Sequence, residues 1–432
     1  MTTTPAAPPA ALADADFCDP AQFDDPWDLY RAVRDTEGLH RDERNGLWVA
    51  GRHEDVFHMS RNPERYCNRF GVRPVVAGDM SIITLDGDEH IRQRRLVNPG
   101  FTPRRVRELV PHIRELSQQL SADIAAKGSV DFVEDFAIHV PLIIICELLG
   151  LDPEQRMKMY RWSDAMMAGD GHSAADSPEL HAAATAFGEY AELLLGLIAE
   201  RRAAPSDADL IGLLTQAFDN GELAKDQAAM PGVSEERIAE ILAERGELSD
   251  EELFAFLTIL LVAGNETTRN GISGGLLALS RFPDEKQRLV DNIDDDEFVD
   301  AAIEELLRYV SPVLGFVRTV TEDHTYRGTE LATGDRVLML YQSANRDERV
   351  FDRPDELILD RMPNPHLAFG IGPHYCLGSN LARTELKIVF QELLRQLPDI
   401  TVPDDVPIRR GASTLVLALQ HLPAECPVAH GA

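Results

Sequence analysis

A glycine-rich stretch near the C-terminal end, with the sequence FGIGPHYCLG at residues 369–378, most constrains how this chain can fold. Closely spaced glycines let the backbone turn tightly and approach a flat partner. A helix predicted for residues 380–396 follows, and the free amides at its N-terminus would stabilise a negatively charged sulfur on Cys376. A lone cysteine beside a turn is more often a buried structural residue. The glycine spacing favours a thiolate site instead.

Most of the remaining chain has the apolar periodicity of amphipathic helices, as in residues 106–124, 189–201 and 300–309. Short runs at residues 47–50 and 337–341 have strand character, and residues 415–422 are predicted to form a β-hairpin arm. We therefore predict a mainly α fold with a small β region. Residues 1–20 are expected to form a flexible tail and residues 21–432 a single domain.

A long helix is predicted for residues 249–280, opened by a capping box of Ser249 and Glu252. Gly264 lies in its middle at a cost of about 1 kcal/mol relative to alanine, which suggests close approach of another group to the backbone. Glu266 and Thr267 follow within an apolar run. A buried charge is costly unless it is partnered. The alternative interpretation is the exposed face of a surface helix.

Composition excludes several classes of protein. The chain has 42 Lys and Arg against 73 Asp and Glu, a net charge of −31, so it lacks the basic footprint of a broad nucleic-acid binder. Five scattered cysteines without a CxxC pair argue against a disulfide scaffold or a cysteine-rich zinc site. No signal peptide is recognised at the N-terminus, and the strongly apolar run at residues 253–263 is shorter than the about 20 residues of a membrane span. We expect a cytoplasmic protein without a membrane span.

The glycine-rich stretch resembles the heme-binding loop of the cytochromes P-450, through the pattern Phe-x-x-Gly-x-x-x-Cys-x-Gly at Phe369, Gly372, Cys376 and Gly378. The resemblance extends over about residues 25–422. It implies a cytochrome P-450 heme-thiolate fold, with heme b as cofactor and Cys376 as the axial thiolate ligand of the iron. Thiolate ligation pushes electron density onto the iron and favours O–O cleavage.

Two helical motifs match the same family. Glu305 and Arg308 are three residues apart and share a helix face, which alone is a common surface pair. The resemblance implies a buried structural pair behind the heme. The stretch around Gly264, Glu266 and Thr267 resembles the oxygen-activating motif, which implies room for the co-substrate O₂ at Gly264 and proton relay by Glu266 and Thr267.

Heme carries two propionates, which bind charge-assisted donors. The resemblance implies that His90, Arg94, Arg318 and His374 hold them, although His90 alone could be a solvated histidine.

The chain departs from the family pattern at two places. The family usually adds a third arginine to the Glu-x-x-Arg pair, and Glu356 stands where it is common. Arg346, Arg353 or Arg361 could substitute for it. The segment at residues 220–247 is longer than expected for bacterial members, and residues 234–247 are predicted to form an exposed helix.

No GxGxxG motif follows a predicted strand, so we expect no flavin or nicotinamide domain in the chain. The resemblance implies that electrons come from NAD(P)H through a ferredoxin reductase and a ferredoxin. A local basic cluster could steer an acidic ferredoxin, or could be a solvated helix face. We expect Arg95, Arg104 and Arg105 to lie on the docking face; the whole cluster comprises Arg92, Arg94, Arg95, Arg104, Arg105 and Arg107.

The expected reaction is hydroxylation of a lipophilic small molecule: a sterol, steroid, terpenoid or branched lipid chain. The family's substrate-contact regions map to mainly apolar or small side chains here, with Arg69 or Arg73 as possible anchors for a carboxylate; the apolar ones include Met166, Met167, Val313, Leu314 and Phe316. Residues 81–83, 100–106 and 363–370 resemble sterol- and lipid-oxidising bacterial enzymes. The alternatives are a peroxygenase that uses H₂O₂, and a heme sensor or lipid binder without turnover.

Overall fold

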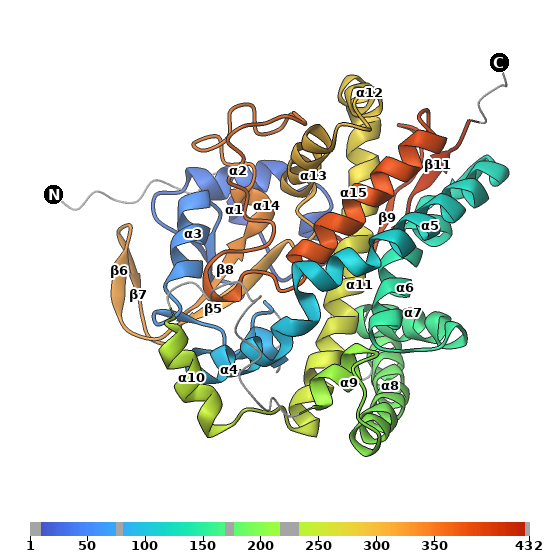
Figure 1. Ribbon diagram of the computed structural model, residues 1–432. Helices are drawn as coiled ribbons and strands as arrows, with labels where there is room; N and C mark the ends of the chain where they lie inside the picture. The colour runs from blue at the N-terminus through green and yellow to red at the C-terminus, as the bar shows by residue number, and fades with distance from the viewer. Residues whose placement is uncertain (1–9, 75–80, 169–176, 217–232, 428–432) are drawn as a thin grey trace.

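A computed structural model describes residues 10–74, 81–168, 177–216 and 233–427 (Figure 1). It is 57% helix and 10% strand, which confirms the prediction of a mainly α fold with a small β region. The principal helices are α2 (Trp27–Asp35), α3 (His53–Arg61), α4 (Gly87–Val97), α5 (Pro103–Lys127), α6 (His139–Leu148), α7 (Pro153–Ala168), α8 (Pro178–Ala203), α9 (Leu210–Thr215), α10 (Glu235–Glu244), α11 (Asp250–Arg281), α12 (Pro283–Asp291), α13 (Asp296–Val310) and α15 (Ser379–Gln396), with short α1 (Ala10–Ala13) and α14 (Tyr341–Ala344).

The β region is dominated by a five-stranded sheet with the order β1-β2-β8-β5-β3. Its strands pair antiparallel except β2 with β8, which are parallel. Its strands are β1 (His40–Asp42), β2 (Leu47–Ala50), β3 (Tyr66–Cys67), β5 (Gly315–Val320) and β8 (Arg336–Leu340). The smaller pairs are β4 (Ser129–Asp131) with β11 (Pro423–Glu425), β6 (His324–Tyr326) with β7 (Thr329–Leu331), and β9 (Arg409–Arg410) with β10 (Leu419–His421).

The predicted hairpin arm at residues 415–422 is different in the structure. Of this stretch, β10 is the part that forms a strand, and it pairs with β9 from earlier in the chain. Val416 makes an isolated bridge to Val313. The apolar run is therefore divided between two partners, because its residues face two different parts of the core.

Helix α11 runs through the middle of the molecule and packs against α6, α7, α13 and α15 (Figure 1). The predicted capping box is present, with reciprocal hydrogen bonds between Ser249 and Glu252. Glycines permit the close packing: a Cβ at Gly275 would lie 2.6 Å from the Cζ atom of Phe390 in α15, and one at Gly274 would lie 2.6 Å from Val310 in α13. The helix thus brings its middle turns against the C-terminal half of the chain.

The N-terminal prediction needs correction for residues 10–20. Leu12 and Phe17 are buried in a cluster with Phe23 and Tyr30, and the Phe17 amide donates to Asp42 Oδ2 at 3.2 Å. Burial of two large apolar side chains fixes this part of the predicted tail to the domain. Residues 1–9 lie outside the described residues.

The helix predicted at residues 234–247 is α10. It packs on α4 and buries Ile238 and Ile241, so it is amphipathic and not fully exposed. The preceding part of the long segment, residues 217–232, lies outside the described residues.

Among the described helices, α8 is long and apolar enough to cross a membrane by length and composition. One face of it is buried, through Ala186, Tyr190, Leu194 and Ile198, and it packs against α7 and α11. A single helix of this kind is weak support for a span, because apolar helices of soluble proteins pass the same test. The predicted absence of a span stays a prediction.

Candidate functional site

A cavity lies between α11, α4, β5 and the loop at residues 369–378. It gathers nine of the twelve predicted site residues from segments far apart in the sequence: His90, Arg94, Gly264, Thr267, Arg318, Phe369, His374, Cys376 and Gly378. Glu266, Glu305 and Arg308 are outside its wall.

The loop that carries Cys376 needs glycine for two separate reasons. Gly370 and Gly372 have φ values of +67° and +79°, which disfavour any residue with a Cβ atom. A Cβ at Gly372 would also lie 2.5 Å from the Ser60 carbonyl oxygen at the end of α3. The loop closes through a hydrogen bond from the Cys376 amide to the Phe369 carbonyl at 3.0 Å. This geometry presents Cys376 to the cavity just before α15.

The sulfur of Cys376 lies in a poorly solvated place. Desolvation raises the pKa of the thiol, while a hydrogen bond from the Gly378 backbone and the charges of Arg94 and Arg383 oppose this effect. A bare thiolate is therefore disfavoured, but hydrogen bonding and positive charge are already arranged around the sulfur. A metal cation at the sulfur would supply the missing stabilisation.

Four cationic or potentially cationic groups line the same cavity. Arg318 is 4% exposed, and the imidazole rings of His90 and His374 lie 4.1 Å apart, centroid to centroid. Within the described residues, neither Arg318 nor Arg94 forms an ion pair with a carboxylate: Arg318 donates to the Val317 carbonyl and Arg94 to the Tyr375 carbonyl. Burial, with the neighbouring positive groups, lowers the pKa of His90 to about 2.

This donor set fits a heme. Burying a guanidinium without a carboxylate is costly, and burial lowers the pKa of both Arg318 and Arg94. Two propionates would supply the missing anions through charge-assisted hydrogen bonds. The donors and the thiol of Cys376 are presented to one cavity, as the binding of heme through iron and propionates requires.

The structural pair is fully buried and has a third member. Arg308 Nε and Nη2 lie 2.7 and 2.8 Å from the two carboxylate oxygens of Glu305, and both side chains are 0% exposed. Arg361 Nε lies 3.1 Å from each of the same oxygens. Arg361 is therefore the residue that takes the place of the usual third arginine.

The other two candidates for that place have different partners. Arg346 stacks over the rings of Trp27 and Tyr309 and pairs with Asp355. Arg353 is exposed and pairs with Glu356, whose backbone carbonyl accepts from the buried arginines instead.

The acid and the threonine of α11 point to different surroundings. Thr267 lines the cavity, and its Oγ1 donates to the Ala263 carbonyl at 2.7 Å. Glu266 is 1% exposed and pairs with Arg269 at 2.5 Å, and Arg269 also lies 3.7 Å from Asp164 of α7. Burial raises the pKa of Glu266, and the charge of Arg269 opposes it. The structure therefore brings Thr267, but not Glu266, to the cavity wall.

Gly264 also packs closely against a neighbouring helix. It lines the cavity, but a Cβ built on it would point at Ile145 of α6, 2.9 Å from its Cδ1 atom. The close packing of α11 on α6 therefore also favours glycine at this position. The role of Gly264 in making room for O₂ stays a prediction.

Sequence reasoning missed Glu385, an acid in the cavity wall on α15. It is 2% exposed, burial raises the pKa of its carboxyl to about 8, and a hydrogen bond from Thr268 opposes this shift. Its Oε1 atom has no hydrogen-bond partner. The available signal was its place four residues after Leu381, on the apolar face of a helix.

The predicted basic cluster is divided by burial. Arg95 is 2% exposed and pairs with Glu235 of α10 at 2.8 Å. It was predicted to lie on an open docking face, and it does not. Arg92 is likewise buried and pairs with Glu89 and Glu252. Arg104, Arg105 and Arg107, at the start of α5, remain at the surface.

The rest of the cavity wall is mainly apolar. Val313 and Phe316 line it as predicted, together with Ile82, Ile83, Phe101, Ile145, Phe256, Ile259 and Leu260. Leu314 instead packs in the N-terminal cluster. Met166 packs against the core cluster that contains Phe101, Ile145 and Phe256 but does not line the cavity, and the side chain of Met167 lies outside the described residues. Arg69 and Arg73 are not part of the wall, and Arg69 stacks on Phe70.

Comparison with known proteins agrees with this geometry. The family profile described as Cytochrome P450 matches residues 47–425. A steroid C26-monooxygenase of Mycolicibacterium smegmatis is 35% identical over 396 residues, covering 92% of this chain and 91% of that protein. A methyl-branched lipid omega-hydroxylase of Mycobacterium bovis is 36% identical over 372 residues, covering 84% and 80%.

Solved structures give the same result. The P450 of the bacillaene polyketide synthase of Bacillus subtilis has a TM-score of 0.80 and 31% identity, covering 95% of this chain and 99% of that one. A Bacillus megaterium P450 solved with testosterone has a TM-score of 0.79 and 29% identity, covering 94% and 99%. The chain therefore belongs to the cytochrome P450 family of heme-thiolate monooxygenases.

Proposed function

We propose that this monooxygenase inserts one oxygen atom from O₂ into an unactivated C–H bond of a steroid, a sterol or a branched lipid chain. The observation that carries the proposal is the wall of the cavity, which is mainly apolar outside the cationic residues that fit the propionates. Apolar walls select lipophilic ligands. The activities printed for two relatives, a steroid C26-monooxygenase and a methyl-branched lipid omega-hydroxylase, support the same substrate class.

In this proposal Cys376 holds the iron, and the propionates are bound by His90, Arg94, Arg318 and His374. Phe369 and Gly378 shape the loop around the sulfur. When bound, a thiolate-ligated heme supplies the reductive activation of O₂.

Proton handling is assigned to α11. The Thr267 hydroxyl in the cavity wall orients and passes a proton at its Oγ1 atom. Glu266 acts behind Thr267, and its buried carboxylate beside Arg269 takes up and releases the proton. Glu305, Arg308 and Arg361 keep the loops behind the heme site in place.

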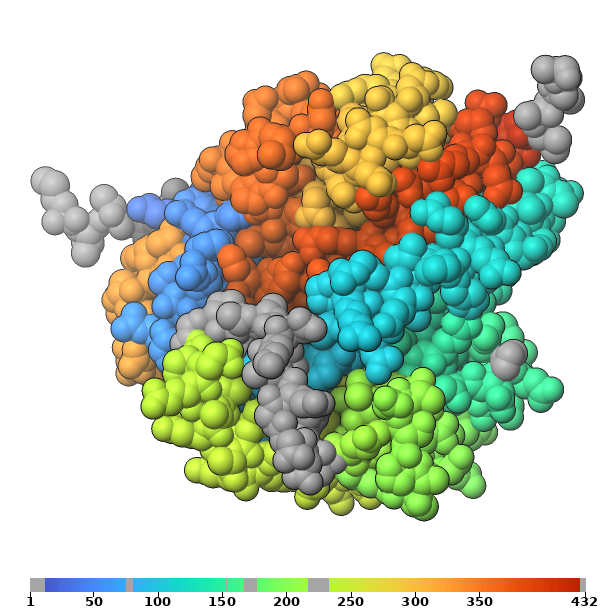
Figure 2. All heavy atoms as spheres, viewed as in Figure 1, coloured from blue at the N-terminus to red at the C-terminus, as the bar shows by residue number. Residues whose placement is uncertain are grey.

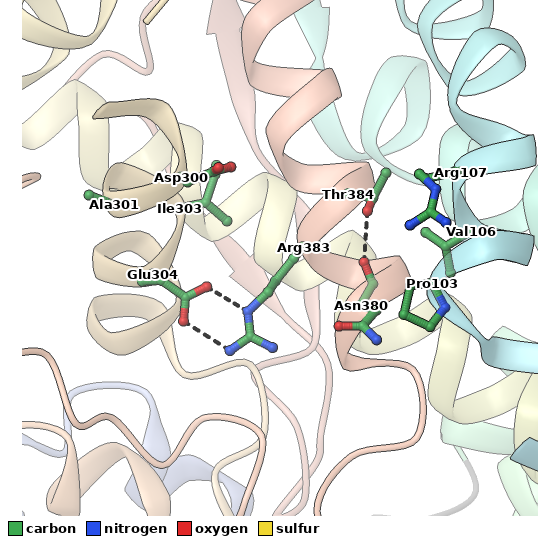
Figure 3. A pocket seen from close by; sticks show the side chains of 10 residues that line it. All are labelled: Pro103, Val106, Arg107, Asp300, Ala301, Ile303, Glu304, Asn380, Arg383 and Thr384. Carbon is green, nitrogen blue, oxygen red and sulfur yellow. Dashed lines mark hydrogen bonds and ion pairs between the residues drawn. The ribbon is translucent and has the colours of Figure 1, made fainter. Parts of the chain in front are cut away.

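Electrons are proposed to come from NAD(P)H through a ferredoxin reductase and an acidic ferredoxin, in the cytoplasm. A surface hollow lies between the first turn of α5, α13 and α15, and Figure 3 shows Arg107 on one side of it and Arg383 on the other. These helices form one broad face in Figure 2. Arg107 lines the hollow, and Arg104 and Arg105 lie beside it in the first turn of α5, so positive charge gathers here in a protein of net charge −31. Arg95 is instead paired with Glu235 of α10.

The test is an optical titration of the purified ferric protein with steroids, sterols, branched fatty acids and terpenoids. A Soret shift from low spin to high spin with steroids or branched lipids, followed by hydroxylated product with ferredoxin, reductase and NADPH, is the expected result. Titration with no shift for any lipid would contradict the substrate class. Turnover with H₂O₂ alone would favour a peroxygenase, and binding without product would favour a sensor or lipid binder.

A further inference from the structure

Arg383 joins the surface hollow to the cysteine loop. It forms a bidentate pair with Glu304 of α13, with Nε 2.5 Å from Oε1 and Nη2 2.9 Å from Oε2 (Figure 3). The same carboxylate contacts Nε2 of His366 at 2.9 Å. Bidentate pairs of this kind fix the guanidinium in one orientation.

Arg383 also contacts two residues of the loop that precede Cys376. Its Nη1 donates to the Tyr375 hydroxyl at 2.9 Å, and its Cζ lies 4.4 Å from the centroid of the Phe369 ring. Phe369 in turn accepts the hydrogen bond from the Cys376 amide. The guanidinium is therefore held against Tyr375, which precedes Cys376 in the chain, and against Phe369, whose carbonyl accepts from the Cys376 amide.

Both charges of the pair are permanent near neutral pH. Burial acts to raise the pKa of Glu304, but hydrogen bonds from Arg383 and His366 hold it at about 2. Both side chains are about one-third exposed, so their fields reach the sulfur partly through protein and are only partly screened.

We propose that the Arg383–Glu304 ion pair sets the reduction potential of the heme iron from outside the heme cavity. Arg383 stabilises the extra electron of the reduced state, and Glu304 opposes it. Both are positioning residues, because they act through Phe369, Tyr375 and the field at the sulfur. The proposal rests on the ligation of iron by Cys376 given above.

The test is a potentiometric titration of the holoenzyme with dye mediators, without an electron donor protein or substrate. Arg383→Gln removes a positive charge and is expected to shift the potential to more negative values. Glu304→Gln removes a negative charge and is expected to shift it to more positive values. Arg107→Gln is the matched control: Arg107 lines the same hollow, and within the described residues no hydrogen bond or ion pair links it to the loop. It is expected to shift the potential least.

Opposite signs for the two variants are the decisive result, because a merely structural disturbance would move both in one direction. Shifts of the same sign, or shifts no larger than that of Arg107→Gln, overturn the proposal. Arg383→Lys keeps the charge without the bidentate geometry, so its reduction potential should stay close to that of the wild type. This variant remains informative if Arg383→Gln does not fold. If the wild-type ferrous carbon monoxide complex lacks the red-shifted Soret band of a thiolate ligand, the ligation by Cys376 itself is wrong.

Discussion

At the scale of single residues, the buried triad shows how one arginine acquires a structural role. Glu305 and Arg308 are near neighbours on α13, whereas Arg361 reaches the same carboxylate from a loop 56 residues downstream. Its guanidinium also donates to the backbone carbonyls of Asp352, Arg353 and Glu356. One side chain therefore ties the loop before the cysteine to α13.

Replacing Arg361 by Gln should destabilise the holoenzyme by about 3 to 5 kcal/mol, the usual effect of removing one partner from a buried ion pair. Urea denaturation followed by circular dichroism measures it. The control is Arg353→Gln, since Arg353 forms an exposed pair and should contribute about 0 to 1 kcal/mol. Equal midpoints for the two variants would contradict the assignment of Arg361 to the triad.

Thr267→Ala should leave substrate binding nearly unchanged and raise the amount of H₂O₂ released per NADPH, because a positioned proton-transfer group is lost. Thr258→Ala is a matched control, because Thr258 Oγ1 also donates one turn back on α11 but is not in the cavity wall. The ratio of product to NADPH consumed is the readout. An unchanged ratio in Thr267→Ala would remove the proposed proton role.

Glu385 should make stability depend on pH in an unusual direction. Its carboxyl keeps a proton in the folded chain up to about pH 8, whereas the unfolded chain loses it near the ordinary value of 4.5. The folded state then binds more protons between these values, so this group's contribution to stability falls as pH rises from about 4.5 to 8.

Glu385→Gln should remove that fall and be more stable than the wild type at pH 8, by on the order of 1 to 3 kcal/mol. Denaturation midpoints at pH 5 and pH 8 measure the effect. Parallel pH curves for the two proteins would show that Glu385 is ionised in the folded chain.

At the scale of elements, α11 is a helix whose composition is set by its neighbours. Its glycines lie where α6, α13 and α15 come closest, and their lower helix propensity is offset by close packing. The N-terminal capping box, in contrast, is a local feature that needs no tertiary contact.

Gly275→Ala should therefore destabilise the protein by about 1 to 2 kcal/mol, because the new methyl group would overlap the Phe390 ring. The energy of this overlap exceeds the gain in helix propensity. Gly188→Ala in α8 has nothing within 4 Å of the new Cβ and should stabilise by up to about 1 kcal/mol. Thermal midpoints of the two variants should move in opposite directions. A rise for both would show that α15 adjusts freely.

At the scale of the whole molecule, the distribution of charge over the surface matters more for docking of an acidic partner than the net charge does. The chain is strongly acidic, yet Arg104, Arg105 and Arg107 gather at one end of α5 beside the hollow of Figure 3. Acidic α10 covers the neighbouring α4 through the pairs Arg95–Glu235 and Asp88–Arg237. The exposed arginines of this cluster therefore lie toward α5, where Arg104 and Arg105 also contact Glu108.

Arg105→Glu should weaken binding of an acidic ferredoxin by about tenfold at low salt, and the difference from wild type should shrink as ionic strength rises. Arg65→Glu reverses an exposed charge that pairs with Glu322, away from this hollow, and should have little effect. Dissociation constants at two salt concentrations are the measurement. Equal losses for both variants would indicate a general charge effect without a docking site at α5.

The cysteine loop, the Glu-x-x-Arg pair, the capping box of α11 and the mainly α architecture were predicted from the sequence, because each depends on residues close together in the chain. Glycine spacing around Cys376 reflects a local backbone requirement, and the geometry of Gly370 and Gly372 agrees with it. The single-domain organisation and the residue roles at the site stay predictions. The family and the lipophilic substrate class agree with the comparisons.

Other features depended on partners that the chain brings from far away. The structure alone selected Arg361 over Arg346 and Arg353, directed Glu266 toward Arg269, enclosed Arg95 under α10 and placed Glu385 in the cavity wall. A charged residue shows its type in the sequence, but its burial and ionisation depend on the groups that pack around it. The sequence by itself thus determined the chemistry that the loop and helices can carry, and the tertiary structure decided which charged side chains face the cavity, the core or the solvent.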